Sequence, residues 1–269
     1  CQVKRGVPLD HLRWAGNFAA KKKPDVIVCI GDFADMESLC SYDYGKKSFE
    51  GRRYSKDISI AIDAMEMLLH PIHEEQERLR RNKEKVWKPR MVLTLGNHED
   101  RITRAIDSDP KLDGVLSLDD LQYSKFGWEV YPFLEPVMID GVAYCHYFTS
   151  GLMGRPVTTT QSLLNKKHQS CIMGHVQGKQ VSVATRADGK QITAIFVGGY
   201  YQHREEYLKH QGNDMQWHGL WMLHQVDDGS FDEMPVSMGY LQRKYGSQST
   251  ELKPPKQGQP EVDSGNFAV

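Results

Sequence analysis

The sequence predicts an α/β protein in which two β-sheets pack against each other and helices flank them. Two observations carry this prediction. In the first half of the chain, helical patterns alternate with short apolar strands. In the second half, apolar runs are separated by tight turns that are typical of hairpins. No internal repeat is present, so we expect these elements to form one domain.

The first half of the chain predicts two helices and two buried strands. Apolar residues recur on one face over 8–21, which predicts a helix, and the apolar run at 25–30 predicts the strand after it. A second helix is expected to begin at Asp57 as its N-cap and to continue to residue 84. Pro71 is expected to kink or end that helix. The second buried strand is predicted at 91–95.

The second half of the chain predicts short strands joined by tight turns. Asp-Gly dipeptides stand at 140–141 and 188–189, and this dipeptide favours two-residue hairpin turns. The predicted strands are 128–131, 137–140, 142–147, 171–173, the two arms of a hairpin over 181–197, 220–226 and 231–238.

Composition excludes several classes of protein. The 34 Lys and Arg residues against 35 Asp and Glu residues give a net charge of −1, so no overall field attracts nucleic acid or an anionic membrane. The longest apolar runs, such as 26–30, are far shorter than the ~20 residues of a membrane helix. The five cysteines include no C-x-x-C pair, and Cys29, Cys145 and Cys171 lie in apolar runs. We therefore expect buried free thiols in a cytoplasmic, globular protein.

The domain is expected to cover residues 1–246, with residues 41–90 as a helical insertion between motifs. Residues 247–269 are rich in Gly, Ser, Gln and Pro, which predicts a flexible tail unless a neighbour holds it, as in a homo-oligomer. The chain opens at Cys1 without a leading strand. We therefore also expect residues upstream of this sequence.

Polar residues follow the ends of four buried strands. They are Asp32, the pair Asn97-His98, His146 and His175. Because the carboxyl ends of strands in α/β sheets meet at one crevice, we expect these side chains to lie close together. A lone His at a strand end is more commonly a structural residue, but Asp, Asn and His together are a mixed oxygen and nitrogen ligand set suited to Zn, Mn or Fe.

These motifs resemble those of the calcineurin-like metallophosphoesterases, including small bacteriophage-encoded members. The motifs are G-D-x-x-D at 31–35, G-N-H-E at 96–99, His146, and 174–177 where the family has G-H-x-H. They occur in the family's order over residues 2–177. The resemblance implies a four-layer α-β-β-α fold and hydrolysis of a phosphoester by a hydroxide held between two divalent cations. It also implies the cytoplasm as the location, which is the host's cytoplasm for a bacteriophage protein.

The resemblance assigns roles to these residues. Asp32 is implied to bridge the two ions. The other ligands of the second ion are implied to be Asn97, His146 and His175. His98 is implied to be the general acid that protonates the leaving oxygen, and Asp35 to orient it.

The first ion site departs from the family's pattern. The family begins with D-x-H, but Gln2 stands where the His would be, and the Asp would precede Cys1. Gln177 replaces the last His of G-H-x-H. Oxygen ligands alone favour Mn or Mg, whereas Zn or Fe also suits the histidine-containing site. The alternative is that both glutamines simply face solvent.

The substrate class is narrowed by the residues after Asp35. Met36 and Glu37 stand where protein Ser/Thr phosphatases of this superfamily carry Arg-Gly, which disfavours that subclass. We expect a phosphodiesterase or nuclease that acts on nucleic acid or a nucleotide. The alternatives are a phosphomonoesterase and a non-catalytic binding protein with an incomplete first metal site.

Several basic residues are candidates for holding the substrate. Arg101 and Arg155 are candidate phosphate clamps. The basic run at 78–90 contains Trp87 and interleaved glutamates. It is either a solvated helix face or a groove for nucleic acid.

Overall fold

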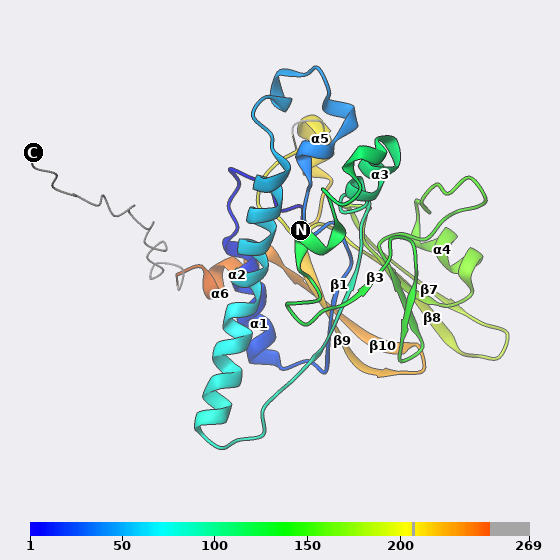
Figure 1. Ribbon diagram of the computed structural model, residues 1–269. Coiled ribbons are helices and arrows are strands. Elements are labelled where there is room, and N and C mark those ends of the chain that lie inside the picture. Colours follow the sequence, from blue (N-terminus) through cyan, green and yellow to red (C-terminus); the bar gives the residue numbers. More distant parts are fainter. Residues whose placement is uncertain (206–207, 248–269) are drawn as a thin grey trace, which may run out of the picture.

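The computed structural model describes residues 1–205 and 208–247 (Figure 1). The protein is of mixed α/β class, with helices and several sheets. The larger elements of the first half are α1 (Asp10–Lys22), β1 (Val26–Cys29), α2 (Tyr54–Arg81), β2 (Arg90–Thr94), α3 (Arg101–Ser108) and β3 (Glu129–Tyr131). Its 3-10 helices are η1 (Glu37–Leu39), η2 (Ser41–Asp43), η3 (Lys47–Phe49), η4 (Pro110–Leu112) and η5 (Leu118–Leu121). Strands β1, β2 and β3 form a parallel sheet in that order.

The second half forms a larger sheet and a separate two-stranded ladder. Its strands are β4 (Val137–Ile139), β5 (Val142–Cys145), β6 (Ser170–Met173), β7 (Lys179–Thr185), β8 (Gln191–Val197), β9 (Gly219–Asp227) and β10 (Ser230–Ser237). Its helices are α4 (Thr160–Lys167), α5 (Lys209–Asp214) and α6 (Met238–Tyr245). The larger sheet has the order β4-β5-β6-β8-β7, and β5, β6 and β8 run parallel. Strand β9 pairs with β10.

The strand predictions agree with the structure to within a few residues, because each apolar run ends at a Gly or a polar residue. The turn at Asp140-Gly141 joins two antiparallel strands, as predicted. The α2 helix differs from its prediction at its start. It begins at Tyr54 rather than after Asp57, and the Asp57 carboxylate accepts a hydrogen bond from the backbone N–H of Ser38 at 2.9 Å. Asp57 therefore fixes the loop before the helix instead of capping it.

Pro71 does not end α2, which continues to Arg81. The proline is buried, and it lies against Gly16 of α1. A Cβ at Gly16 would lie 2.2 Å from the carbonyl oxygen of Leu68 and 3.0 Å from Cδ of Pro71. The two helices therefore approach closely where α1 has no side chain. This packing stabilises a helix that the missing N–H of proline would otherwise weaken.

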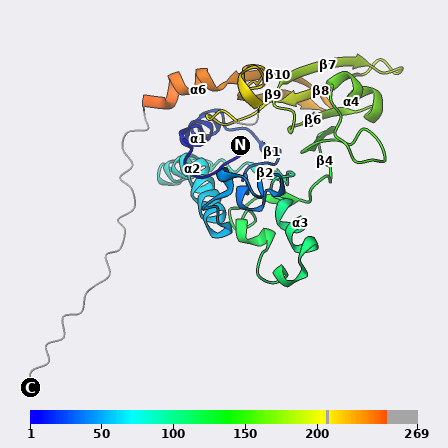
Figure 2. The same cartoon turned by 90° about the horizontal axis from the view of Figure 1, so that it is seen from above.

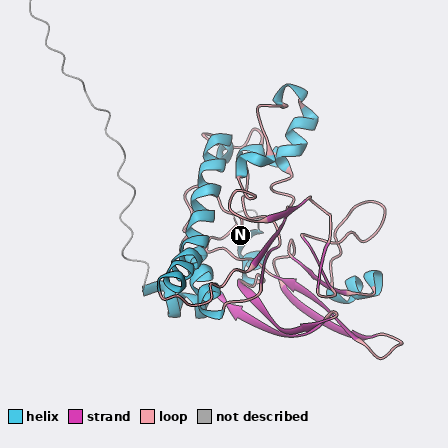
Figure 3. Ribbon diagram, turned by 60° about the horizontal axis from the view of Figure 1, so that its bottom comes forward, coloured by secondary structure: helices cyan, strands magenta, loops and turns pink. Residues whose placement is uncertain are grey.

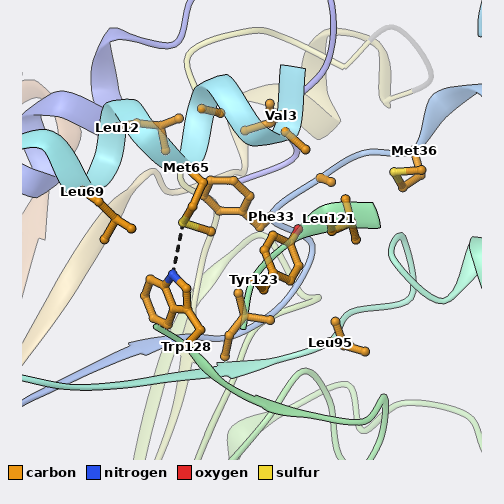
Figure 4. Packing of buried hydrophobic residues seen from close by; sticks show 14 of the residues in the cluster. Val3, Leu12, Phe33, Met36, Met65, Leu69, Leu95, Leu121, Tyr123 and Trp128 are labelled. Atoms are coloured by element: carbon orange, nitrogen blue, oxygen red, sulfur yellow. Dashed lines mark hydrogen bonds between the residues drawn. The ribbon is translucent and has the colours of Figure 1, made fainter. Parts of the chain in front are cut away.

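The largest buried cluster joins α1 and α2 to the sheet of β1, β2 and β3 (Figure 4). It includes Leu12 of α1, Met65 and Leu69 of α2, and Leu93 of β2. The indole of Trp128 donates a hydrogen bond to the sulfur of Met65 at 3.2 Å, which Figure 4 shows as a dashed line. Helix α2, which lies within residues 41–90, contributes to this core.

Three further clusters connect the remaining elements. One joins Val92 of β2 to Val142, Ile172 and Ile195 of the larger sheet. Another packs Leu163 and other residues of α4 against the larger sheet, and Figure 2 shows α4 beside β6 and β8. The last cluster places Trp14 and Phe18 of α1 against α6, β9 and β10, so α1 is apolar on two faces. Figure 3 shows the long helices gathered on one side of the strands.

Other sequence predictions concern cysteines, membranes and the tail. All five cysteines are free thiols, and Cys145 and Cys171 are buried as predicted, whereas Cys29 is only half-buried. Within residues 1–205 and 208–247, none of the helices combines the length and hydrophobicity that crossing a membrane requires. The predicted tail and its contact in an oligomer lie almost entirely in residues 248–269, outside the described residues.

Candidate metal centre

The loops after β1 and β2 meet at two glycines. Gly31 and Asp32 have positive φ angles of 69° and 49°. A Cβ at Gly31 would lie 2.6 Å from the backbone nitrogen of Gly96, and a Cβ at Gly96 would lie 2.2 Å from Oδ1 of Asp32. Both positions therefore need glycine, because a larger residue would separate the two loops. The Gly in each motif places Asp32 beside the residues that follow β2.

A buried carboxylate, that of Glu99, ties these two loops together. It accepts hydrogen bonds from the backbone N–H groups of Asp32 at 3.0 Å, Ala34 at 2.9 Å and Gly96 at 2.8 Å. Glu99 has no solvent exposure, so these charge-assisted bonds form away from water. The sequence indicated no role for Glu99 beyond its place in the G-N-H-E motif, because two of its three partners, Asp32 and Ala34, lie in another loop.

Four side chains predicted as metal ligands lie together. The ligand atoms of Asp32, His146 and His175 all lie within 4.8 Å of one another. Oδ1 of Asn97 lies 2.9 Å from Nε2 of His146 and 2.9 Å from Nδ1 of His175. These residues follow β1, β5, β6 and β2, so the carboxyl ends of strands from both sheets meet here. The structure thus brings together the whole histidine-containing ligand set, which we call the histidine site.

The tautomer of His146 decides what the histidine site can bind. Nδ1 of His146 lies 2.9 Å from the carbonyl oxygen of Ile30, and a carbonyl only accepts, so Nδ1 carries the hydrogen. In the neutral ring, Nε2 then has a lone pair. This lone pair faces Oδ1 of Asn97 at 2.9 Å and Oδ2 of Asp32 at 3.3 Å, both of which are acceptors. A cation between these atoms, either a proton or a metal ion, removes this conflict.

The pKa values agree with this reading. Burial would lower the pKa of His146, but the Asp32 carboxylate outweighs burial and raises it. Burial would raise the pKa of Asp32, but His146 and His98 lower it, so Asp32 is an anion at neutral pH. His175 is exposed on one side, and partial burial together with His146 lowers its pKa to about 4. His175 is therefore neutral at pH 7 and its ring can bind a metal ion.

His98 and Asp35 form a second arrangement next to the histidine site. Nδ1 of His98 lies 2.6 Å from Oδ1 of Asp35, and its Nε2 lies 3.8 Å from Oδ2 of Asp32. Burial would lower the pKa of His98, but the carboxylates of Asp32 and Asp35 raise it. Asp35 is also within 3.5 Å of the Lys4 ammonium. Burial would raise the pKa of Asp35, but His98 and Lys4 hold it well below its usual range.

The two glutamines predicted for the first ion site also lie together. Nε2 of Gln177 is 3.5 Å from Oε1 of Gln2. The Gln177 amide oxygen accepts hydrogen bonds from the Tyr201 hydroxyl at 2.7 Å and from the Gln216 amide. We call Gln2, Gln177 and Gln216 the glutamine cluster. Gln2 is only 7% exposed, so the alternative that it faces solvent is wrong.

The two candidate phosphate clamps differ in position. One guanidinium nitrogen of Arg101 donates to the carbonyl oxygen of Asp35 at 2.6 Å and contacts its carboxylate at 3.1 Å. Arg101 therefore holds Asp35, which no sequence pattern indicated. Arg155 is exposed in the loop closed by the bridge between Thr149 and Pro156. Among the described residues, no hydrogen bond or ion pair of its side chain joins it to the centre.

Three of the seven cations in the predicted basic run, Arg78, Arg80 and Arg90, are paired with acidic side chains. Arg78 contacts Glu75 at 2.7 Å. Arg90, at the end of the run, contacts Glu129 at 2.7 Å. These exposed pairs favour a solvated helix face over a groove for nucleic acid.

A cavity of about 760 Å³ begins at Asp32, His146 and His175 and continues between α1, β1 and β9. Away from the centre it is lined by apolar residues such as Phe18 and Met222. Charged side chains also line the cavity away from the centre, including Lys22, Lys23 and Asp25, so polar atoms face a ligand at both ends.

The chemistry open to the centre follows from its own residues. An anionic carboxylate, an amide oxygen and two imidazoles suit a divalent ion of intermediate hardness, and a His–Asp pair beside them suits proton transfer. No protein-family model matches the chain, and no similar protein was found among curated proteins or solved structures.

Proposed function

We propose that this protein is a metallophosphoesterase of the calcineurin-like type, which hydrolyses a phosphoester at a divalent ion held by Asp32, Asn97, His146 and His175. One observation carries the proposal. The lone pair of His146 Nε2 in the neutral ring and the oxygens of Asp32 and Asn97 converge, at 3.3 Å and 2.9 Å from the nitrogen, so that no hydrogen lies between them. Such convergence of acceptors is costly unless a cation lies among them.

The arrangement of elements supports the four-layer α-β-β-α fold as part of this proposal. Apolar residues of β2 and of the larger sheet share one cluster. Helices α1 and α2 pack on the sheet of β1, β2 and β3, and α4 packs on the larger sheet. This order of contacts is the one that the four-layer fold requires.

Each residue then has a chemical task. When bound, the ion supplies the Lewis acidity that stabilises negative charge on the phosphoryl group. His98 donates a proton from Nε2 to the leaving oxygen, because Nδ1 is held by Asp35 at 2.6 Å. Arg101 and Lys4 keep the Asp35 carboxylate ionised and in place. His98 is thus the general acid, and Asp35 is its orienting residue.

The ligand set favours Mn, Zn or Fe over Mg. Two imidazoles and two oxygens are compatible with Zn, Fe and Mn, while Mg prefers oxygens alone. Mn accepts both ligand types. We therefore propose Mn as the ion that supports activity best, with Zn or Fe as competitors.

Aromatic and basic residues in the loop after Asp35 favour a phosphodiester of nucleic acid or a nucleotide as the substrate. The loop after Asp35 carries Tyr42 and Tyr44, which are 81% and 65% exposed. The same loop carries Arg52, whose guanidinium lies 5.5 Å from the centre of the Phe49 ring and pairs with the carboxylate of Asp43 at 2.8 Å. Exposed aromatic rings such as Tyr42 and Tyr44 are a surface on which the bases of a single strand can stack.

A panel of assays with Mn tests this proposal. The substrates are bis-p-nitrophenyl phosphate, p-nitrophenyl phosphate, and labelled single- and double-stranded DNA. We expect hydrolysis of the diester and of DNA, its loss in His98→Ala, and no change in the control His73→Ala, because His73 is exposed on α2. Hydrolysis of the monoester alone would contradict the phosphodiesterase proposal. The absence of hydrolysis in both wild type and His98→Ala would instead favour a non-catalytic binding protein.

A further inference from the structure

The glutamine cluster lies where the resemblance implies a first metal ion, and its hydrogen bonds argue against one. The inference concerns how many ions the centre holds, and it rests on the proposed function. Gln2 and Gln177 are the residues that replace the two histidines of that ion site.

The amide oxygen of Gln177 has no lone pair left for a metal ion. An amide oxygen accepts two hydrogen bonds. In Gln177 the Tyr201 hydroxyl provides one of them at 2.7 Å, and the Gln216 amide provides the other. An ion that took this oxygen as a ligand would have to break one of these bonds, both of which are partly buried.

The surroundings hold Gln177 in this orientation. Oε1 of Gln216 lies 3.1 Å from Nε2 of His218, which fixes the amide that donates to Gln177. The backbone N–H of Trp217 donates to the carbonyl oxygen of Gln177 at 3.0 Å. The other end of the Gln177 amide donates toward Gln2 at 3.5 Å. The segment at 216–218 therefore holds Gln177 through both its side chain and its backbone.

The nearby carboxylates are also committed to cationic partners. Glu205 accepts from Lys4 at 3.0 Å and contacts Nε2 of His203 at 2.7 Å. Asp35 is held by His98, Lys4 and Arg101. A second ion would therefore have only Asp32 and neutral amides among the described residues, and this is little charge for a divalent cation.

We infer that the centre is mononuclear: it binds one divalent ion at the histidine site, and hydrogen bonds of the glutamine cluster occupy the position of the other. The two sites are adjacent, yet the Gln177 oxygen already faces two donors, whereas the Nε2 lone pair of neutral His146 faces two acceptors. The Lys4 ammonium and the Arg101 guanidinium supply fixed positive charge beside Asp35.

Metal stoichiometry tests this inference with a readout that does not depend on hydrolysis. The protein is saturated with Mn²⁺, freed of excess ion by gel filtration, and analysed for bound Mn by mass spectrometry and electron paramagnetic resonance. We expect one equivalent per chain and a spectrum of isolated Mn²⁺. Gln177→Ala is expected to keep one equivalent, whereas His175→Ala should bind Mn²⁺ at least ~100-fold more weakly, since loss of even an outer partner costs about 10–100-fold.

The outcomes separate the inference from the proposed function. Two equivalents with spin-coupled Mn²⁺ in the wild type would overturn the mononuclear inference and leave the phosphoesterase proposal intact. No bound Mn²⁺ together with no hydrolysis would overturn the phosphoesterase proposal itself. The wild-type stoichiometry decides the inference even if Gln177→Ala fails to fold.

Discussion

The histidine site and the glutamine cluster lie side by side but use opposite hydrogen-bond arrangements. In the histidine site, a nitrogen lone pair and two oxygens face one another. In the glutamine cluster, the Gln177 oxygen faces two donors. The difference teaches that proximity of ligand-type atoms does not by itself indicate a cation site. The better criterion is whether the acceptors already have donors.

The two regions also differ in how they are held. A buried carboxylate, Glu99, fixes the loops that carry Asp32 and Asn97 through three backbone N–H groups. Neutral amides and a tyrosine hydroxyl hold the glutamine cluster. We therefore expect mutations near the histidine site to cost more than mutations in the glutamine cluster.

The largest effect is expected from His98, which serves the histidine site without being one of its ligands. His98→Gln removes the proton donor but keeps a polar side chain, so kcat toward bis-p-nitrophenyl phosphate should fall ~10²–10⁴-fold. Bound Mn²⁺ should stay at the wild-type level. Steady-state kinetics and metal analysis of the same preparation measure both, with His73→Gln as the control. A loss of Mn²⁺ in His98→Gln would show that His98 is itself a ligand of the histidine site.

Much of the histidine site was predictable from the sequence, because its residues follow strand ends. Each of Asp32, Asn97 and His146 comes directly after a recognisable apolar run, and parallel strands bring such positions to one edge. The strands themselves were predictable for the same reason. Spacing in the chain was therefore enough to place these residues together.

The glutamine cluster was only half predictable. Gln2 and Gln177 stand at motif positions, but Gln216 and Tyr201 come from loops without a pattern, and it is their donors that close the cluster. The support that α2 receives at Pro71 was not predictable for a related reason, because the stabilising contact is with Gly16 in another helix. Tertiary contacts of this kind leave no trace in local periodicity.

The next effect concerns the carboxylate that holds the histidine site together. Glu99→Gln replaces an acceptor oxygen by an NH₂ group, which faces backbone N–H donors in a fully buried position. We expect the free energy of unfolding to fall by roughly 3 kcal/mol, because charge-assisted bonds are lost and a donor is left unpaired. Urea unfolding measures this, with the exposed Glu135→Gln as the control. Equal free energies of unfolding in Glu99→Gln and Glu135→Gln would contradict the expectation that the histidine site is held more firmly than the glutamine cluster.

The pH dependence of the free energy of unfolding tests the region of the glutamine cluster. There, His11 of α1 contacts the loop that carries Tyr201 and Gln202. His11 is 1% exposed, its Nδ1 lies 3.3 Å from Oε1 of Gln202, and its Nε2 has no hydrogen-bond partner among the described residues. Burial lowers its pKa from 6.5 to about 3. Below pH 6.5 the unfolded chain therefore takes up a proton that the folded chain refuses, so stability falls as the pH falls toward 3 and is unaffected above 6.5.

His11→Phe should remove this dependence. From this residue the wild type is expected to lose up to about 1.4 kcal/mol for each pH unit below 6.5, and the variant should show a shallower slope. Urea unfolding at pH 7, 6 and 5 measures the slopes, with the exposed His73→Gln as a control that keeps the wild-type slope. Because a larger ring changes stability at every pH alike, the slope is the informative quantity. Identical slopes in His11→Phe and wild type would contradict a neutral, buried His11.

The smallest effect is expected within the glutamine cluster itself. Tyr201→Phe removes the hydroxyl that donates to the Gln177 oxygen at 2.7 Å, and one neutral hydrogen bond contributes about 1 kcal/mol to the free energy of unfolding. Urea unfolding should show this loss, whereas Tyr240→Phe on the exposed face of α6 should cost less than about 0.5 kcal/mol.

Tyr201→Phe also frees one lone pair of Gln177 for a cation. Because a neutral amide oxygen adds no charge, bound Mn²⁺ should remain at one equivalent. A second equivalent in Tyr201→Phe would mean that the tyrosine hydroxyl alone separates the glutamine cluster from a metal site.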